Sequence, residues 1–108
     1  MFTIPEGETL QQKQARFVRM VGHLIAQSSV MGYDVTFGDA YREGDPRCHG
    51  KRLAIDLNLF IDGEYKKCTE AHRPLGEFWE SMAPDAFWGG RISSGDGNHY
   101  SLRHGKIA

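Results

Sequence analysis

The stretch CHGKRLAIDLNLFIDGEY, residues 48–65, contains the clearest strand pattern in the chain. Large apolar residues alternate there with smaller or polar ones, and this period of two places the two sets on opposite faces of a β-strand. One face consists of Leu53, Ile55, Leu57, Leu59 and Ile61, and the other of Ala54, Asp56, Asn58 and Phe60. Asp62-Gly63 is typical of a two-residue hairpin turn, so we expect the chain to return over residues 64–69. Asp56 therefore points away from the apolar face and does not interrupt the core.

A long amphipathic helix is predicted before this strand. Thr9 and Gln12 have the spacing of a capping box, which marks the start of a helix. Apolar residues then recur at helical intervals as far as a break near Gly32. They are Leu10, Phe17, Val18, Met20, Val21, Leu24 and Ile25.

Shorter elements are predicted on both sides of the hairpin. Residues 33–37 and 99–103 read as strands, and residues 75–82 read as a short helix with Phe78 and Trp79 facing inward. A helix followed by a small antiparallel sheet, with a second helix inserted into it, predicts an α+β fold.

Length and composition exclude several classes of protein. At 108 residues the chain is expected to form one domain, residues 1–108. A formal net charge of -1 lacks the positive excess of a nucleic-acid-binding protein. The apolar runs are interrupted well before the roughly 20 residues that span a bilayer, so no membrane insertion is expected. Two cysteines, Cys48 and Cys68, are too few for a disulfide scaffold.

A metal site is predicted from residues in two distant parts of the chain. His49 lies in a loop that leads back onto the strand of Asp56, and His99 begins the last predicted strand. Two imidazoles and one carboxylate with an open fourth position are typical of a catalytic Zn²⁺. Asp96, three residues before His99, would be a free carboxylate able to carry a proton between water and a leaving amine. The chemistry indicated is hydrolysis of an amide.

These residues also form a family pattern. The segments HGKRLAID and DGNH, separated by Trp88-Gly89-Gly90, resemble the VanY-type D-alanyl-D-alanine carboxypeptidases and L-alanyl-D-glutamate endopeptidases. That family, common among bacteriophage endolysins, shows Ser-x-His-x-x-Gly-x-Ala-x-Asp and later Asp-x-x-His. Here His49, Ala54 and Asp56 match the first motif, and Asp96 and His99 match the second. Tyr41-Arg42 resembles the family's Gly-Tyr-Arg, and the resemblance covers about residues 32–102.

The resemblance implies a hedgehog/D-Ala-D-Ala peptidase-like form of the α+β fold. It implies His49, Asp56 and His99 as zinc ligands, Asp96 as general acid and base, and Arg42 as electrostatic support for the oxyanion. The implied substrate is the peptide stem of bacterial peptidoglycan, cut by a monomeric endolysin. Because the N-terminal segment has no signal-peptide pattern, we expect synthesis in the host cytoplasm and access to the wall after another protein permeabilises the membrane.

The sequence departs from the family at two motif positions and in one loop. Arg47 stands where the family usually has Ser, and Arg52 stands where it has Gly. The loop from Arg42 to His49 is also much shorter than the family norm. These changes leave the ligands in place, but they leave open which bond of the peptide stem is cut.

Alternative interpretations remain at this level. Cys48, His49, Cys68 and His72 have the residue types of a closed Cys₂His₂ structural zinc, which would make the chain a noncatalytic zinc-binding or virion assembly module. His104 is a rival ligand in a polar tail, residues 103–108, that looks frayed.

Single residues have alternatives too. Arg42 could instead form a surface salt bridge with Asp39 or Glu43. Trp88, beside two glycines, is a candidate for a cleft wall. Each ligating histidine is expected to donate its other ring N–H to a nearby acceptor.

Overall fold

A computed structural model describes all residues from Met1 to Ala108. Two α-helices, five strands and three short 3₁₀ helices follow one another along the chain. In order they are α1 (Leu10–Val30), β1 (Asp34–Phe37), η1 (Cys48–Lys51), β2 (Ala54–Ile61), β3 (Glu64–Lys66), η2 (Thr69–His72), α2 (Arg73–Ser81), β4 (Ala86–Trp88), η3 (Gly89–Arg91) and β5 (His99–Leu102). The fold is α+β with an open antiparallel sheet, as predicted. None of its helices has the length and apolar character needed to cross a membrane.

Strand β2 lies at the centre of the sheet, whose order is β1-β2-β5-β4. Its first half pairs with β5, and the pairing places Asp56 directly opposite His99. Its second half pairs with β1 on one side and with β3 on the other. The register of β2 and β5 therefore joins two segments that are more than forty residues apart in the sequence.

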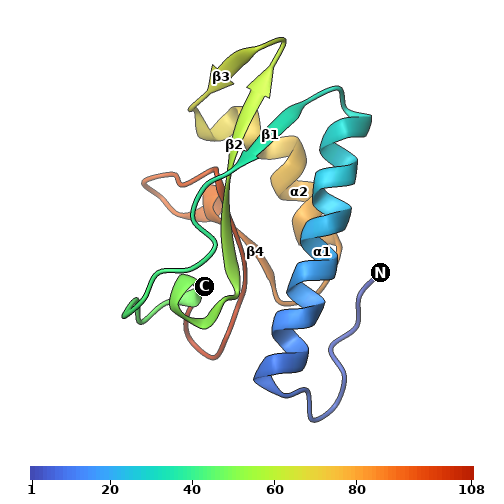
Figure 1. Cartoon of the computed structure of the whole chain (residues 1–108), viewed down its shortest axis with the longest axis vertical. Helices are drawn as coiled ribbons and strands as arrows, with labels where there is room; N and C mark the ends of the chain where they lie inside the picture. The colour runs from blue at the N-terminus through green and yellow to red at the C-terminus, as the bar shows by residue number, and fades with distance from the viewer.

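The core lies between the helices and one face of this sheet. From α1, Phe17, Met20, Val21 and Leu24 are buried together with Leu75 and Trp79 of α2 and the apolar face of β2. Figure 1 shows α1 along one side of the molecule, while η1 and the C-terminus lie on the other side of β2. Asp56 belongs to the sheet face turned away from the core, as the alternation predicts.

The local signals at the helix start and the hairpin are confirmed. The backbone N–H of Gln12 donates to Thr9 Oγ1 at 3.2 Å, and the N–H of Thr9 donates to Gln12 Oε1 at 2.9 Å, which completes the capping box. Asp62 and Gly63 have φ of 52° and 76°, the left-handed geometry of a primed hairpin turn.

Other expectations were wrong in detail. Strand β3 ends at Lys66, so Cys68 is an exposed residue before η2 and not part of a strand. Strand β4 was not predicted, because three residues are too few to show a period. The tail is not frayed: His104 and Ile107 form a β-bridge, and Ile107 packs against the core.

Candidate metal centre

Three side chains from separate elements converge on the open face of the sheet. His49 comes from η1, Asp56 from β2 and His99 from the first position of β5. One ligand atom from each lies within 4.8 Å of the others. His49 Nε2 is 3.2 Å and His99 Nδ1 is 3.6 Å from Asp56 Oδ1. This group can hold a metal ion.

The burial of His49 supports a metal ligand at this position. Its side chain is only 4% exposed, yet neither ring nitrogen makes a hydrogen bond of good geometry, although Nε2 faces Asp56 Oδ1 at 3.2 Å. Buried polar groups are nearly always paired, since an unpaired one costs about 1–3 kcal/mol. An ion between His49 and Asp56 would satisfy Nε2. Nδ1 has no acceptor within the protein, so the protein itself supplies none of the kind expected for a ligating histidine.

The electrostatics favour the protonation states that a metal requires. Burial lowers the pKa of His49, and the nearby charges of Arg42 and His99 lower it further, against the opposing effect of Asp56. Burial raises the pKa of Asp56, but its contacts with His99, His49 and Arg42 outweigh this, and the pKa lies below its usual value. At neutral pH the site therefore offers a neutral His49 and an ionised Asp56, as metal binding demands.

Backbone contacts hold Asp56 from the side of β1. Its N–H donates to the carbonyl of Asp39 at 2.9 Å, and its carbonyl accepts from Gly38 at 2.7 Å. A Cβ at Gly38 would lie 3.0 Å from that of Asp56, so this approach is tight. On the other side of β2, His99 pairs with Asp56. The ligand is thus fixed between two neighbouring segments.

Arg42 lies beside the carboxylate of Asp56 and forms the predicted salt bridge with Asp39. Its Nη2 donates to Asp56 Oδ2 at 3.0 Å, and its Nε donates to Asp39 Oδ2 at 2.8 Å. Asp45 lies 3.6 Å from Nη1. The hydrogen bond that Arg42 donates to Asp39 raises the pKa of Arg42 against some desolvation, and Asp56 adds to the effect. Arg42 is therefore a salt-bridge partner of Asp39 and also the residue that holds the second oxygen of Asp56.

Asp96 lines the same cleft of about 460 Å³ as the three ligands. Its side chain is exposed, and its backbone is fixed by hydrogen bonds to Gly89 and His99. A Cβ on Gly89 would meet the carbonyl of Asp96 at 2.1 Å, which requires glycine there. Trp88 Nε1 donates to the carbonyl of Gly97 at 2.8 Å. Trp88 is fully buried and so holds the Asp96 loop from within the core, which corrects the expectation of a cleft wall.

The rival zinc ligands are not brought together. Cys48 is buried with its thiol donating to the carbonyl of Leu102 at 3.2 Å, and burial raises its pKa. Cys68 is exposed, and both cysteines are free. His72 Nδ1 lies 3.0 Å from the hydroxyl of Tyr100. No group of these residues can hold an ion.

His104, the other rival ligand, contacts a lysine of α1 and not the metal centre. His104 Nδ1 lies 3.3 Å from Lys13 Nζ, on the side of the molecule that faces α1. His104 is therefore no part of the group that can hold an ion.

Sequence reasoning did not place Asp45 or Arg47 at the site, although both line the cleft. Asp39, predicted as a salt-bridge partner of Arg42, does pair with it. Asp39 and Asp45 each stand three residues from Arg42, a spacing that marks possible partners. Arg47 had been noted only as a departure from the family motif.

No protein-family model matches this chain, and neither does any curated protein or any solved structure.

Proposed function

We propose that this domain is a zinc-dependent peptidase that hydrolyses an amide bond in the peptide stem of bacterial peptidoglycan. The observation that supports this most is the convergence of His49, Asp56 and His99, with the nitrogens of buried His49 unpaired. The motifs that resemble VanY-type peptidases supply the substrate class.

Zinc is the metal that this donor set favours. Two imidazoles and one carboxylate leave a fourth position open, which is the pattern of catalytic zinc sites. Magnesium and calcium favour sites made of oxygen ligands. A zinc ion held there would act as a Lewis acid toward water and the substrate carbonyl near neutral pH.

Asp96 and Arg42 are the residues proposed to act on the reacting groups. The Asp96 carboxylate makes no hydrogen bond or ion pair with another side chain, so it is free to take a proton from the attacking water. It would then pass that proton to the leaving amine. Arg42, 3.0 Å from Asp56, adds positive charge where the oxyanion develops.

The biological setting follows from the resemblance to endolysins. We propose that the protein acts as a monomer during lysis of a bacterial host by a bacteriophage. It would be made in the host cytoplasm and would reach the wall once a separate protein has permeabilised the membrane.

The test separates metal binding from catalysis by replacing Asp96→Asn. Zinc content should stay at one ion per chain, while the release of new amino groups from purified peptidoglycan should fall about 10²- to 10⁴-fold. Asp62→Asn, an exposed carboxylate in the distant hairpin, is the matched control and should change neither quantity. His49→Ala should lose both zinc and activity.

Two results would overturn parts of the proposal. Unchanged lysis by Asp96→Asn would remove Asp96 as the proton carrier. Wild-type protein that binds zinc but releases no amino groups would favour a noncatalytic zinc-binding or virion assembly module. Mass spectrometry of the digested peptidoglycan would identify the bond that is cut.

A further inference from the structure

The cleft contains two arginines in different electrostatic states. Arg42 contacts three carboxylates, those of Asp39, Asp45 and Asp56, at 2.8, 3.6 and 3.0 Å. Arg47 lines the same cleft, and its guanidinium takes part in no ion pair or side-chain hydrogen bond. The charge of Arg42 is thus largely compensated within the protein, whereas that of Arg47 is not.

The backbone of Arg47 is fixed although its side chain is exposed. Its N–H donates to Asp45 Oδ1 at 2.7 Å, and its carbonyl accepts from the N–H of Gly50 at 3.1 Å. A Cβ on Gly50 would meet the carbonyl of Asp45 at 1.8 Å, so this turn closes only around glycine. Two residues after Arg47 comes the ligand His49. The turn therefore presents Arg47 at a defined place on the rim of the metal site.

The charge balance of the cleft depends on Arg47. Apart from the histidines, the cleft is lined by two arginines, by the carboxylates of Asp45, Asp56 and Asp96, and by Ala108, whose α-carboxylate carries a fourth negative charge. With a divalent ion bound, the four positive charges balance the four negative ones, and the balance becomes negative if Arg47 is neutral. Arg47, which has no ion-pair partner, is then the positive group left to attract an anionic substrate group. Among anions, a carboxylate matches the planar fork of a guanidinium with two parallel hydrogen bonds.

We infer that Arg47 binds a free carboxylate of the substrate and selects stem peptides that have one close to the bond that is cut. This inference rests on the proposed peptidase function and adds a specificity residue to it. A stem peptide offers two main candidates, the α-carboxylate of D-glutamate and the C-terminal carboxylate of D-alanine. Conversion of a carboxylate to a carboxamide removes the charge and almost keeps the shape.

The experiment compares three soluble stem peptides: the parent, its D-glutamate α-carboxamide and its C-terminal carboxamide. Wild-type protein loaded with zinc should have a KM about 10- to 100-fold higher for one of the two carboxamides, with kcat little changed. Arg47→Gln should raise the KM of the parent by a similar factor and abolish the difference between the peptides. Arg47→Lys, which keeps the charge but not the planar fork, should have a KM for the parent peptide between those of the wild type and Arg47→Gln.

Arg19→Gln is the matched control. Arg19 is an exposed arginine on α1 that also takes part in no ion pair, and it lies outside the cleft. This variant should keep the preference of the wild type. Zinc content should be the same in all variants.

Binding measured without cleavage separates this inference from the proposed function. Calorimetry with zinc-loaded Asp96→Asn protein, with and without Arg47→Gln, should show the same preference for the peptide with the free carboxylate. Equal affinity for all three peptides, or a preference that survives Arg47→Gln, would overturn the role of Arg47. If the peptides bind with this preference but the wild type cuts none of them and no peptidoglycan, only the proposed hydrolysis fails.

Discussion

At the scale of single residues, the two oxygens of Asp56 have different partners. Oδ1 faces both imidazoles, while Oδ2 accepts a hydrogen bond from Arg42. A carboxylate held in this way presents one oxygen to an ion and is prevented from turning. Residues that orient a ligand from behind typically change metal affinity 10- to 100-fold when they are replaced.

Arg42→Gln is accordingly expected to weaken metal binding about 10- to 100-fold, because Oδ2 of Asp56 loses its partner. Competition with a chromogenic chelator measures the zinc Kd directly. Arg73→Gln serves as the control, since Arg73 pairs with Glu70 on the surface. An unchanged Kd combined with lost activity would mean that Arg42 acts on the substrate alone.

His72 predicts a pH dependence of stability that is independent of the metal. It is 2% exposed, and burial lowers its pKa from the ordinary value of 6.5. The unfolded chain therefore binds a proton more readily than the folded one. The stability that neutral His72 contributes is complete above pH 6.5 and is lost as the pH falls through its lowered pKa.

Replacement of His72→Gln should flatten this dependence. We expect the free energy of unfolding of the metal-free protein, measured in urea, to fall as the pH is lowered below 6.5. The fall should be up to about 1.4 kcal/mol per pH unit steeper in the wild type than in the variant. Metal-free protein is used because His49 also has a lowered pKa, and its contribution cancels in the comparison. Parallel pH profiles would show that the pKa of His72 is the same in the folded and unfolded states.

At the scale of elements, a glycine sets the contact between α2 and β4. A Cβ on Gly76 would lie 2.1 Å from the ring of Trp88, whose indole holds the carbonyl of Gly97. Helix α2 thus approaches the sheet closely, and Trp88 transmits that packing to the loop of Asp96. A larger residue at position 76 has to push the helix away.

Two glycine-to-alanine replacements in helices should therefore have opposite effects. Gly76→Ala should lower the free energy of unfolding by about 1–3 kcal/mol through overpacking against Trp88. Gly22→Ala should raise it by about 0.5–1 kcal/mol, because Gly22 is exposed in α1 with open space around its Cα. Thermal unfolding of the two variants measures both changes. Stabilisation by Gly76→Ala would contradict the close contact.

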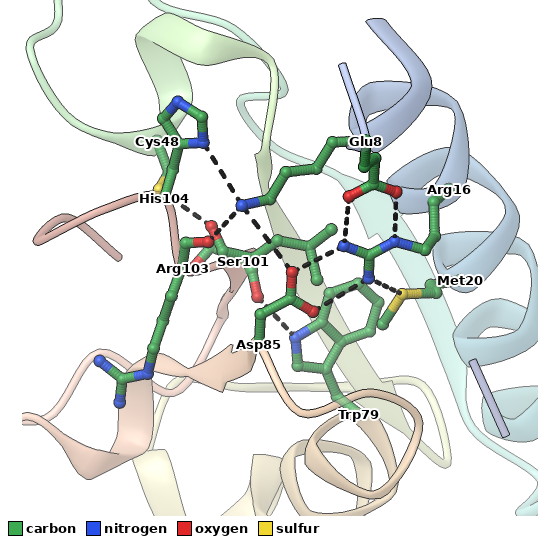
Figure 2. A network of polar contacts seen from close by, with 11 residues as sticks. Glu8, Arg16, Met20, Cys48, Trp79, Asp85, Ser101, Arg103 and His104 are labelled. Carbon is green, nitrogen blue, oxygen red and sulfur yellow. Dashed lines mark hydrogen bonds and ion pairs between the residues drawn. The ribbon is translucent and has the colours of Figure 1, made fainter. Parts of the chain in front are cut away.

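At the scale of the whole molecule, an ion-pair network around a buried arginine joins parts that are distant in the sequence. Arg16 of α1 donates to Glu8 at 2.8 and 3.0 Å and to Asp85 at 2.9 and 2.7 Å, and its side chain is only 2% exposed. Figure 2 shows its guanidinium between these two carboxylates, with Met20 beside it. The hydrogen bond from Arg16 lowers the pKa of Glu8. The network fixes the N-terminal segment and the loop before β4 to one helix.

Arg16→Met should destabilise the fold by about 3–5 kcal/mol, because two carboxylates are left without a partner. Urea unfolding measures this loss. Arg73→Gln, which breaks an exposed pair, should leave stability nearly unchanged. The triple variant Glu8→Leu, Arg16→Met and Asp85→Leu should recover most of the loss, and failure to recover it would mean that the charges themselves are needed.

The sequence by itself determined the parts of the fold that depend on neighbouring residues. The capping box at Thr9, the period of two in β2 and the turn at Asp62-Gly63 act through local backbone geometry, so their structures follow from their residues. The same alternation placed Asp56 on the open face. Motif spacing also selected His49 and His99 as partners for it, without showing that they meet.

Only the tertiary structure decided that meeting, because the register between β2 and β5 sets Asp56 against His99. It also decided that Trp88 lies in the core, that the cysteines are separated and that the guanidinium of Arg47 has no acidic partner. Such features arise from packing and pairing between segments far apart in the chain. The free energy that stabilises them comes from contacts among many residues, so no short stretch of sequence predicts them.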